Sequence, residues 1–176
     1  MTAILLARHG ETDWNREGRF QGWADPPLND TGRAQARALA ERLRSTAFDA
    51  VYSSDLRRAH ETAEIVAAPH AVPVVTDPQL REIDVGSWSG LTRPEIEQRF
   101  GGERLDGETR EQHAARVVAA VERIARRHPG QRILIVTHGG TMRALHSHAV
   151  QTPWEPIDNC GVVELRFRDD RLVRAI

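Results

Sequence analysis

The chain has 176 residues, of which 40% are hydrophobic and 28% are charged. This length suits a domain with a core of its own, and the composition excludes both a disordered chain and a membrane-spanning one. The formal net charge is -1, so no overall field attracts the chain to nucleic acid or to an anionic membrane. We therefore expect one globular domain over residues 1–176, in which any anion-binding site is local.

The N-terminal residues lack the basic, long apolar and small-residue regions of a signal peptide, which predicts a cytoplasmic protein. Cys160 is the single cysteine, so an internal disulfide and a cysteine-based metal site are excluded. We expect its thiol to be a small buried side chain. No internal repeat, low-complexity tract or linker divides the sequence.

The first half of the chain alternates short apolar runs with amphipathic stretches. Residues 3–7 predict a buried strand, and residues 33–44 predict a helix because their apolar side chains recur at helical spacing. Residues 49–54 predict a second strand and residues 56–67 a second helix. Pro69 and Pro73 then interrupt the chain before an extended stretch at residues 74–75.

The second half begins with a loop-rich stretch that carries Glu82 within residues 80–85 and leads to a short helix after residue 92. Residues 108–127 predict a long amphipathic helix whose apolar stripe consists of Ala114, Val117, Val118, Val121 and Ile124. Residues 132–137 are continuously apolar and rich in β-branched side chains, as in a strand buried on both faces. A further helix begins near Gly139, and residues 160–168 predict a late edge strand.

Strands that alternate with helices predict an α/β fold, a three-layer sandwich with a mostly parallel central sheet flanked by helices. In such sheets, ligands bind beyond the carboxyl ends of the strands. Arg8 and His9 follow the first strand, Arg57 and Arg58 follow the second, and His138 follows residues 132–137. These side chains should therefore meet at one edge of the sheet, and Glu82 is expected to reach it too.

A pocket with two arginines, two histidines and one glutamate suits a phosphate dianion. The planar guanidinium group binds phosphate oxygens in a bidentate manner and keeps its charge. The helix that begins near Gly139 adds backbone N–H groups and the positive end of its dipole. Spacing alone leaves open whether a histidine at a strand end is a nucleophile, an acid, an electrostatic clamp or a structural residue.

The sequence around these residues resembles the histidine phosphatase superfamily, which includes the cofactor-dependent phosphoglycerate mutases and many phosphatases. The similarity starts with Arg-His-Gly-Glu-Thr-Asp-Trp-Asn at residues 8–15. It continues in the family's order through residues 22–28, 53–63, 80–82, 86–90 and 137–140. This covers the motif-bearing parts of nearly the whole chain. The resemblance implies the phosphoglycerate mutase-like fold. Among members of the family, the sequence is most similar to the short cofactor-independent phosphatases.

The resemblance implies that His9 is a nucleophile that becomes phosphohistidine and that Glu82 protonates the leaving oxygen. It makes Arg8, Arg58 and His138 the phosphate clamp. The other substrate-binding residues that we infer are Asn15, Gln21, Gly22 and Gly139. These roles agree with physical chemistry, because an attacking imidazole must be neutral and its other nitrogen should donate to a backbone carbonyl. A cationic His138 would best stabilise the transferred phosphoryl group.

Other polar residues near these motifs are given ordinary structural roles. Arg57 is expected at the rim or in an ion pair, Ser53 and Ser54 in turns or caps, and Glu11 as support for its loop. Surface or packing roles are expected for His60, His70, His113, His128, His146 and His148. Packing is also expected for at least half of the tryptophans, which are Trp14, Trp23, Trp88 and Trp154. Neither a metal-ligand cluster nor a nucleotide-binding Gly-Lys-Ser/Thr motif is recognisable, so no metal or other cofactor is expected to be required.

Three functions are compatible with these residues, namely phosphate-ester hydrolysis, mutase chemistry and non-catalytic binding of a phosphorylated ligand. Mutases of this family are usually longer after the acid-bearing block and tend to carry Phe-Thr-Gly-Trp where this chain has Gln21 in Phe-Gln-Gly-Trp. We therefore favour hydrolysis of a small phosphorylated metabolite, with the mutase as the alternative. The binding module is least favoured because every catalytic match is present. Ser89 replaces the glutamate of a frequent Trp-Glu-Gly motif, so the substrate stays open. A homodimer is the commonest assembly among oligomers.

Overall fold

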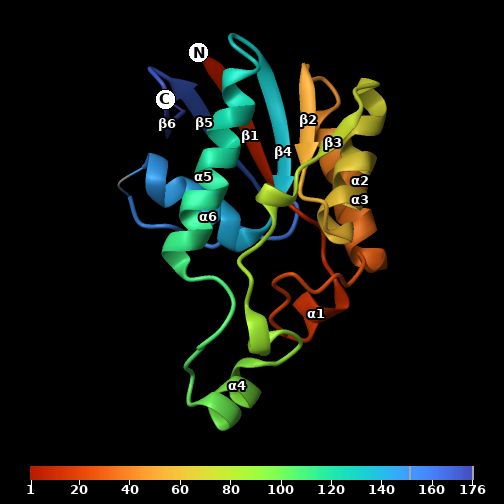
Figure 1. Ribbon diagram of the computed structural model, residues 1–176. Helices are drawn as coiled ribbons and strands as arrows, with labels where there is room; N and C mark the ends of the chain where they lie inside the picture. The colour runs from red at the N-terminus through yellow and green to blue at the C-terminus, as the bar shows by residue number, and fades with distance from the viewer. Residues whose placement is uncertain (151, 176) are drawn as a thin grey trace.

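The two most apolar runs of the chain form the centre of a six-stranded sheet in the computed structural model, which describes residues 1–150 and 152–175 (Figure 1). β1 (Thr2–Arg8) pairs in parallel with β4 (Arg132–Thr137). β2 (Ala50–Ser53) and β3 (Val74–Thr76) continue the parallel sheet beyond β4. β5 (Val162–Arg168) lies antiparallel on the other side of β1, and β6 (Arg171–Arg174) pairs with β5. The strand order is therefore β3-β2-β4-β1-β5-β6.

Helices cover both faces of this sheet. α5 (Arg110–Arg126) and α6 (Gly139–Ala149) lie on one face, and α2 (Asp30–Leu43) and α3 (Arg57–Ala67) lie on the other (Figure 1). Successive side chains of a strand point to opposite faces. Accordingly, Ile4 and Leu6 pack in the core beneath α5 and α6, whereas Leu5 and Ala7 pack in the core beneath α2 and α3. The predicted three-layer α/β fold is confirmed.

The shorter elements of the chain belong to the segments that connect the strands and the longer helices. These elements are α1 (Asp13–Arg16), α4 (Arg93–Phe100) and the 3₁₀ turns η1 (Ala68–His70), η2 (Pro78–Leu80) and η3 (Gly86–Trp88). In Figure 1, α1 and α4 lie beyond the ends towards which the arrows of β2 and β4 point. The loop-rich middle and the short helix after residue 92 are thus confirmed.

The C-terminal strand pair differs from the prediction. β5 is an inner strand, because β6 pairs with its free side and forms the edge of the sheet. The two strands are joined through Asp169 and Asp170, both of which have positive φ values, 51° and 60°. Positive φ at both central residues is typical of the type I′ turn, whose twist matches that of the two strands. The Asp-Asp pair between alternating sequences was the signal for a hairpin.

Two predicted helices also differ in detail. α2 begins at Asp30 and not at residue 33, because the Asn29 side chain accepts the backbone N–H of Gly32 at 2.8 Å and caps the helix. In α5 the buried face is rotated from the predicted stripe. Ala114 and Val118 are only half-buried. The buried residues are His113, Val117, Ala120, Val121, Ile124 and Ala125.

The loop after β1 packs on the first turn of α2 by direct backbone contact. A Cβ atom on Gly10 would lie 2.5 Å from the carbonyl oxygen of Gly32, and a Cβ atom on Gly32 would lie 2.1 Å from the carbonyl oxygen of Glu11. Both separations are shorter than real Cβ contacts, so glycine at both positions allows the two segments to meet. The main chain directly after His9 is thereby fixed.

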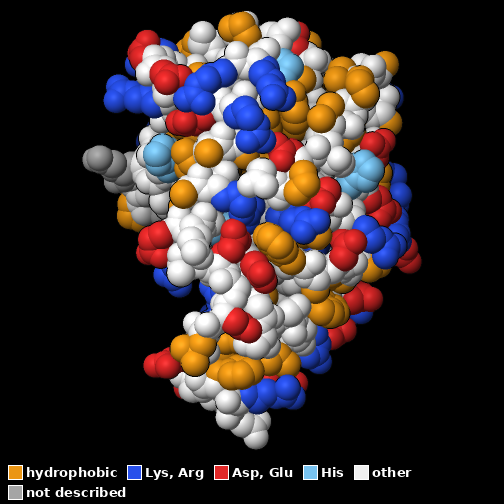
Figure 2. All heavy atoms as spheres, in the orientation of Figure 1, with side chains coloured by type: hydrophobic (Ala, Val, Ile, Leu, Met, Phe, Trp, Pro, Cys, Tyr) orange, Lys and Arg blue, Asp and Glu red, His pale blue; other side chains and the backbone are white. Residues whose placement is uncertain are grey.

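The surface carries charges of both signs. Basic and acidic side chains are interspersed over the face drawn in Figure 2, with a group of basic ones towards its upper end. Within the described residues, no helix combines the length and the apolar character needed to cross a bilayer.

Candidate active site

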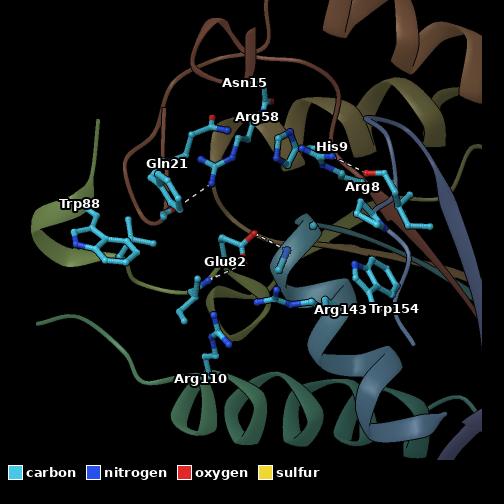
Figure 3. Close-up of a pocket in the computed structure, with 18 of the residues that line it drawn as sticks. Arg8, His9, Asn15, Gln21, Arg58, Glu82, Trp88, Arg110, Arg143 and Trp154 are labelled. Carbon is cyan, nitrogen blue, oxygen red and sulfur yellow. Dashed lines mark hydrogen bonds between the residues drawn. The ribbon is translucent and has the colours of Figure 1, made fainter. Parts of the chain in front are cut away.

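A cavity of about 430 Å³ opens at the carboxyl ends of β1 and β4 (Figure 3). Eight of the nine predicted site residues line it, namely Arg8, His9, Asn15, Gln21, Gly22, Arg58, Glu82 and Gly139. The ninth, His138, is fully buried and contacts the ring of His9 edge-on, with 5.2 Å between the ring centroids. The topology has therefore brought the predicted residues together from five separate parts of the chain.

The His9 ring is held in one tautomer. Its Nδ1 atom lies 2.7 Å from the carbonyl oxygen of Gly10. Since a carbonyl only accepts hydrogen bonds, Nδ1 carries the proton and Nε2 keeps its lone pair. The backbone N–H of His9 donates to the Thr137 carbonyl of β4 at 2.9 Å, which fixes the residue to the sheet. The expected donation to a backbone carbonyl is confirmed.

His9 is also kept neutral. Burial lowers its pKa well below the ordinary value, and the positive charges of Arg58 and Arg8 lower it further. The bond to the Gly10 carbonyl acts in the opposite direction but is outweighed. At pH 7 the ring therefore presents an unprotonated Nε2, the state that a nucleophile requires.

His138 is the residue before the first turn of α6, and its Nε2 atom lies 2.8 Å from the hydroxyl oxygen of Ser54. Burial lowers its pKa well below the ordinary value, and Arg58 and His9 add to this effect. His138 is therefore neutral here, because a fully buried imidazolium beside Arg58 would be strongly disfavoured. That the ring is cationic when it contacts a transferred phosphoryl group stays a prediction. Ser54, expected in a turn or cap, caps Leu56 and also contacts this histidine.

Arg58 is the main buried charge of the site. Its Nη1 and Nη2 atoms donate to the carbonyls of Ala24 and Gly22, each at 2.8 Å, and only 1% of the residue is exposed. Burial lowers the pKa of this guanidinium to about 10, so it stays charged at pH 7. Arg57 points elsewhere. Its side chain is exposed, and its backbone N–H donates to Asp25. The choice of Arg58 over Arg57 as the pocket residue agrees with this placement.

Three buried nitrogen atoms of the site have no hydrogen-bond partner within residues 1–150 and 152–175. They are Nε of Arg8, Nε of Arg58 and Nδ1 of His138. Arg8 is otherwise anchored by donation from Nη1 to the Ile157 carbonyl at 2.6 Å. Buried polar groups without partners are costly. Two of these three unpartnered nitrogen atoms belong to cationic donors and the third to an imidazole ring. Together they suit an anion with several acceptor oxygens.

Glu82 is held by backbone groups at the edge of this site. Its Oε2 atom accepts the N–H of Gly140 at 2.8 Å, and its Oε1 atom accepts the N–H of Ile83 at 2.9 Å. A Cβ atom at position 140 would lie 2.4 Å from the carboxylate, so the approach depends on glycine. The expectation that the N-terminus of α6 offers its N–H groups to phosphate is wrong for Gly140, whose N–H is already used by Glu82.

His113 is a site residue that sequence reasoning missed. It is 4% exposed, and its Nε2 atom lies 3.0 Å from the Thr141 hydroxyl and 3.8 Å from Oε1 of Glu82. The Thr141 hydroxyl proton is donated to the carbonyl of Arg81, so Nε2 of His113 is the donor to Thr141 and carries a proton. Burial lowers the pKa of His113. A histidine four residues before Val117, on the buried face of α5, was the available signal.

The remaining predicted residues have mainly supporting contacts. Oδ1 of Asn15 accepts the backbone N–H of Thr12 at 3.1 Å, and Oε1 of Gln21 accepts the Thr12 hydroxyl at 2.7 Å. Gly22 has φ = 50°, and its carbonyl accepts from Arg58. Among the tryptophans, Trp88 and Trp154 line the cavity. Sequence reasoning also missed three further arginines on the cavity wall, Arg104, Arg110 and Arg143.

Metal ligands do not gather at this cavity or elsewhere in the part of the chain that the structure describes. No group of three or more histidine, cysteine, aspartate or glutamate side chains is placed to hold an ion there.

The buried histidines predict how stability depends on pH. In the unfolded chain a histidine titrates near pH 6.5, whereas burial lowers the pKa values of His9 and His138 in the folded state. Above pH 6.5 both states are neutral and the two residues contribute no pH dependence. Below it the unfolded state binds protons that the folded state does not, so the free energy of unfolding should fall by up to about 1.4 kcal/mol per pH unit for each histidine.

Urea denaturation at pH 7.5, 6.5 and 5.5 measures this slope. The variant His138→Gln should show a smaller slope than the parent protein, and His148→Gln, at an exposed position of α6, is the control for loss of a surface histidine. A parent protein whose free energy of unfolding is constant over this range would contradict the assignment of two buried neutral histidines.

Several known proteins are similar to this chain in sequence. The family model described as "Histidine phosphatase superfamily (branch 1)" matches residues 4–175. A metal-independent phosphoserine phosphatase of Arabidopsis thaliana is 42% identical over 189 aligned positions, which cover 98% of this chain and 79% of that protein. A probable phosphoglycerate mutase, GpmB of an Enterobacter strain, is 35% identical and covers 96% of this chain and 86% of its own.

Solved structures agree with the sequence matches. YhfR of Bacillus stearothermophilus superposes with a TM-score of 0.93 at 36% identity, covering 100% of this chain and 96% of that one. A mycobacterial glucosyl-3-phosphoglycerate phosphatase complexed with VO3 has a TM-score of 0.88 at 30% identity, with 99% and 97% coverage. These matches confirm the fold that the sequence blocks implied.

Proposed function

Because this chain belongs to branch 1 of the histidine phosphatase superfamily, we propose that it hydrolyses a small phosphate monoester through a phosphohistidine on His9. The observation that carries the proposal is the state of the His9 ring. Its proton is fixed on Nδ1 by Gly10, and Nε2 keeps its lone pair in a cavity lined by Arg8 and Arg58. A neutral nucleophile among fixed positive charges is what transfer of a phosphoryl group requires.

The first step forms the phosphoenzyme. The free Nε atoms of Arg8 and Arg58 bind phosphate oxygens, and Nδ1 of His138 is the remaining buried group for a third contact. Nε2 of His9 attacks phosphorus, and the bond from phosphorus to the ester oxygen breaks. Glu82, which enters the step as the neutral acid, gives its proton to the leaving oxygen, so that a neutral alcohol departs.

The second step releases phosphate. The carboxylate of Glu82 takes a proton from water, and the water oxygen attacks the phosphohistidine. The bond from phosphorus to Nε2 breaks, which restores neutral His9 and protonated Glu82. The Gly140 and Ile83 N–H groups that hold the carboxyl group keep it at the same place in both steps, so one residue acts first as acid and then as base.

Mutase chemistry is the second candidate, and the similarity to probable phosphoglycerate mutases supports it. In a mutase the phosphohistidine passes its group to a second hydroxyl of the bound sugar acid and not to water. The route from Gly90 through α4 to the start of α5 at Arg110 is short, and Gln21 stands at the position where mutases tend to have threonine. Both features favour hydrolysis.

Product analysis separates the two candidates. With 3-phosphoglycerate and its bisphosphate primer, we expect inorganic phosphate to accumulate and little 2-phosphoglycerate to form. A panel of sugar phosphates, phosphoglycerates, nucleotides and phosphorylated cofactor precursors should likewise release phosphate from at least one member. Efficient production of 2-phosphoglycerate would reverse the choice in favour of the mutase.

A further inference from the structure

The cavity has more positive charge than one phosphate group can balance. Five guanidinium groups line it, against the single carboxylate of Glu82, and His9 is neutral. This excess is local, because the whole chain has a formal charge of -1. A phosphate monoester brings roughly two negative charges at neutral pH. About two positive charges in the cavity would then remain unbalanced with Glu82 ionised, and about three with Glu82 carrying the proton that it gives to the leaving oxygen.

The five arginines differ in the hydrogen bonds and ion pairs that their guanidinium groups make. Arg8 and Arg58 lie with His9, and Arg104 donates to the backbone carbonyls of Asp84, Asp106 and Glu108, which ties the loop before α5 together. Arg110 and Arg143 are exposed and have neither a hydrogen bond nor an ion pair from their side chains within residues 1–150 and 152–175. These two guanidinium groups are therefore the uncommitted charges of the cavity.

Their position relative to Glu82 indicates which part of a substrate they would meet. Arg110 comes from the first turn of α5 and Arg143 from α6, and both project into the cavity in Figure 3. In that view Glu82 lies between these two arginines and the group formed by His9 and Arg58. Since Glu82 protonates the leaving oxygen in the proposed reaction, the leaving alcohol extends past Glu82 towards Arg110 and Arg143.

We propose that Arg110 and Arg143 bind a second anionic group on the leaving alcohol, so that the preferred substrates are phosphate monoesters that also carry a carboxylate or a second phosphate. The inference rests on the proposed phosphatase function and adds the substrate class to it. Guanidinium groups suit both kinds of anion because their planar fork matches carboxylate and phosphate oxygens. The unpaired state of the two side chains leaves their donors free for this contact.

Matched substrates test the proposal because each pair differs mainly in the second anion. O-phosphoserine is compared with O-phosphoethanolamine, and 3-phosphoglycerate with glycerol 3-phosphate. Propane-1,3-diol bisphosphate is compared with 3-hydroxypropyl phosphate, which tests a second phosphate in place of a carboxylate. Because the second anion would form charge-assisted hydrogen bonds, we expect kcat/KM to be about tenfold to a hundredfold higher for the doubly anionic member. This should hold for the pairs that differ in a carboxylate, for the pair that differs in a second phosphate, or for both.

Variants connect this preference to the two arginines. Arg110→Gln and Arg143→Gln should lower kcat/KM for the preferred doubly anionic esters by about tenfold or more and abolish most of the preference when combined. Hydrolysis of p-nitrophenyl phosphate, which has no second anion, should fall by a smaller factor, so the ratio of the two kcat/KM values measures the contact with the second anion. Arg127→Gln is the matched control, since it removes an exposed arginine from the other end of the same helix, about 25 Å away along the axis.

The outcomes separate this inference from the proposed function. Equal losses on both members of every pair, or no preference in the parent protein, would overturn the second anion site while leaving the phosphatase intact. If no ester is hydrolysed, the phosphatase proposal fails, and calorimetric titration of the His9→Ala variant with the same pairs still tests the site. Tighter binding of the doubly anionic members, lost in Arg110→Gln and Arg143→Gln, would support it; equal binding would overturn it.

Discussion

Replacing His9 with alanine is expected to lower kcat for phosphate esters by about 10⁴-fold or more, because removing the nucleophile leaves only binding and charge stabilisation. Those remain, since the Arg8 and Arg58 anchors to Ile157, Gly22 and Ala24 do not involve the His9 ring. The parent protein incubated with a phosphate ester should form an acid-labile, base-stable phosphoprotein. His9→Ala should form none.

The control for this experiment is His60→Ala, which removes an exposed histidine paired with Glu64 and should leave both turnover and the phosphoprotein unchanged. Circular dichroism and urea denaturation show whether each variant is folded. A folded His9→Ala protein that releases phosphate at the parent rate would contradict the phosphohistidine mechanism. It would also make His9 only one of several polar residues around an anion site.

The second large effect is expected for Glu82→Gln, and it should depend on the leaving group. Glutamine has no acidic proton, so hydrolysis of esters of sugar alcohols should slow by about 10² to 10⁴-fold. Nitrophenolate leaves with little protonation, so p-nitrophenyl phosphate should lose about tenfold or less. Steady-state kcat/KM for a series of esters with leaving groups of graded pKa measures this difference as the slope of the logarithmic plot.

Glutamine also disturbs the local hydrogen bonds, because its amide NH₂ group cannot accept the N–H of Gly140 or Ile83 as a carboxylate oxygen does. The free energy of unfolding should therefore be measured beside the kinetics. Glu111→Gln, at an exposed position in the first turn of α5, controls for loss of a negative charge. Equal losses on alkyl and nitrophenyl esters would mean that Glu82 positions the substrate and does not transfer a proton.

Much of the fold could be predicted because the central strands are buried on both faces. The continuous apolar run of β4 permits few alternatives, and its predicted bounds agree with the structure. The carboxyl ends of parallel strands must share an edge, so the approach of His9 to His138 followed from topology. β6 was missed because a strand of four residues after a tight turn has too short a pattern to stand out from a loop.

The parts of the site that were missed depend on how helices pack, which spacing alone does not reveal. His113 reaches Glu82 only because α5 lies against α6 and brings it to Thr141. Arg110 and Arg143 come from different helices and belong to no motif block, so nothing in the sequence connects them. The neutral state of His138 likewise results from complete burial beside Arg58, whereas sequence reasoning considered only the charge of the ligand.

The position of β1 in the sheet determines when the candidate catalytic residues can assemble during synthesis. β1 pairs on one side with β4 and on the other with β5, and both of these strands follow it by well over half of the chain. His9 leaves the ribosome before those strands, and its backbone hydrogen bond to Thr137 of β4 cannot form until β4 is available. Such long-range pairing is slow to form. We therefore expect the nascent chain to gain its catalytic geometry only after β5 has emerged, with the apolar β1 segment depending until then on protection from aggregation.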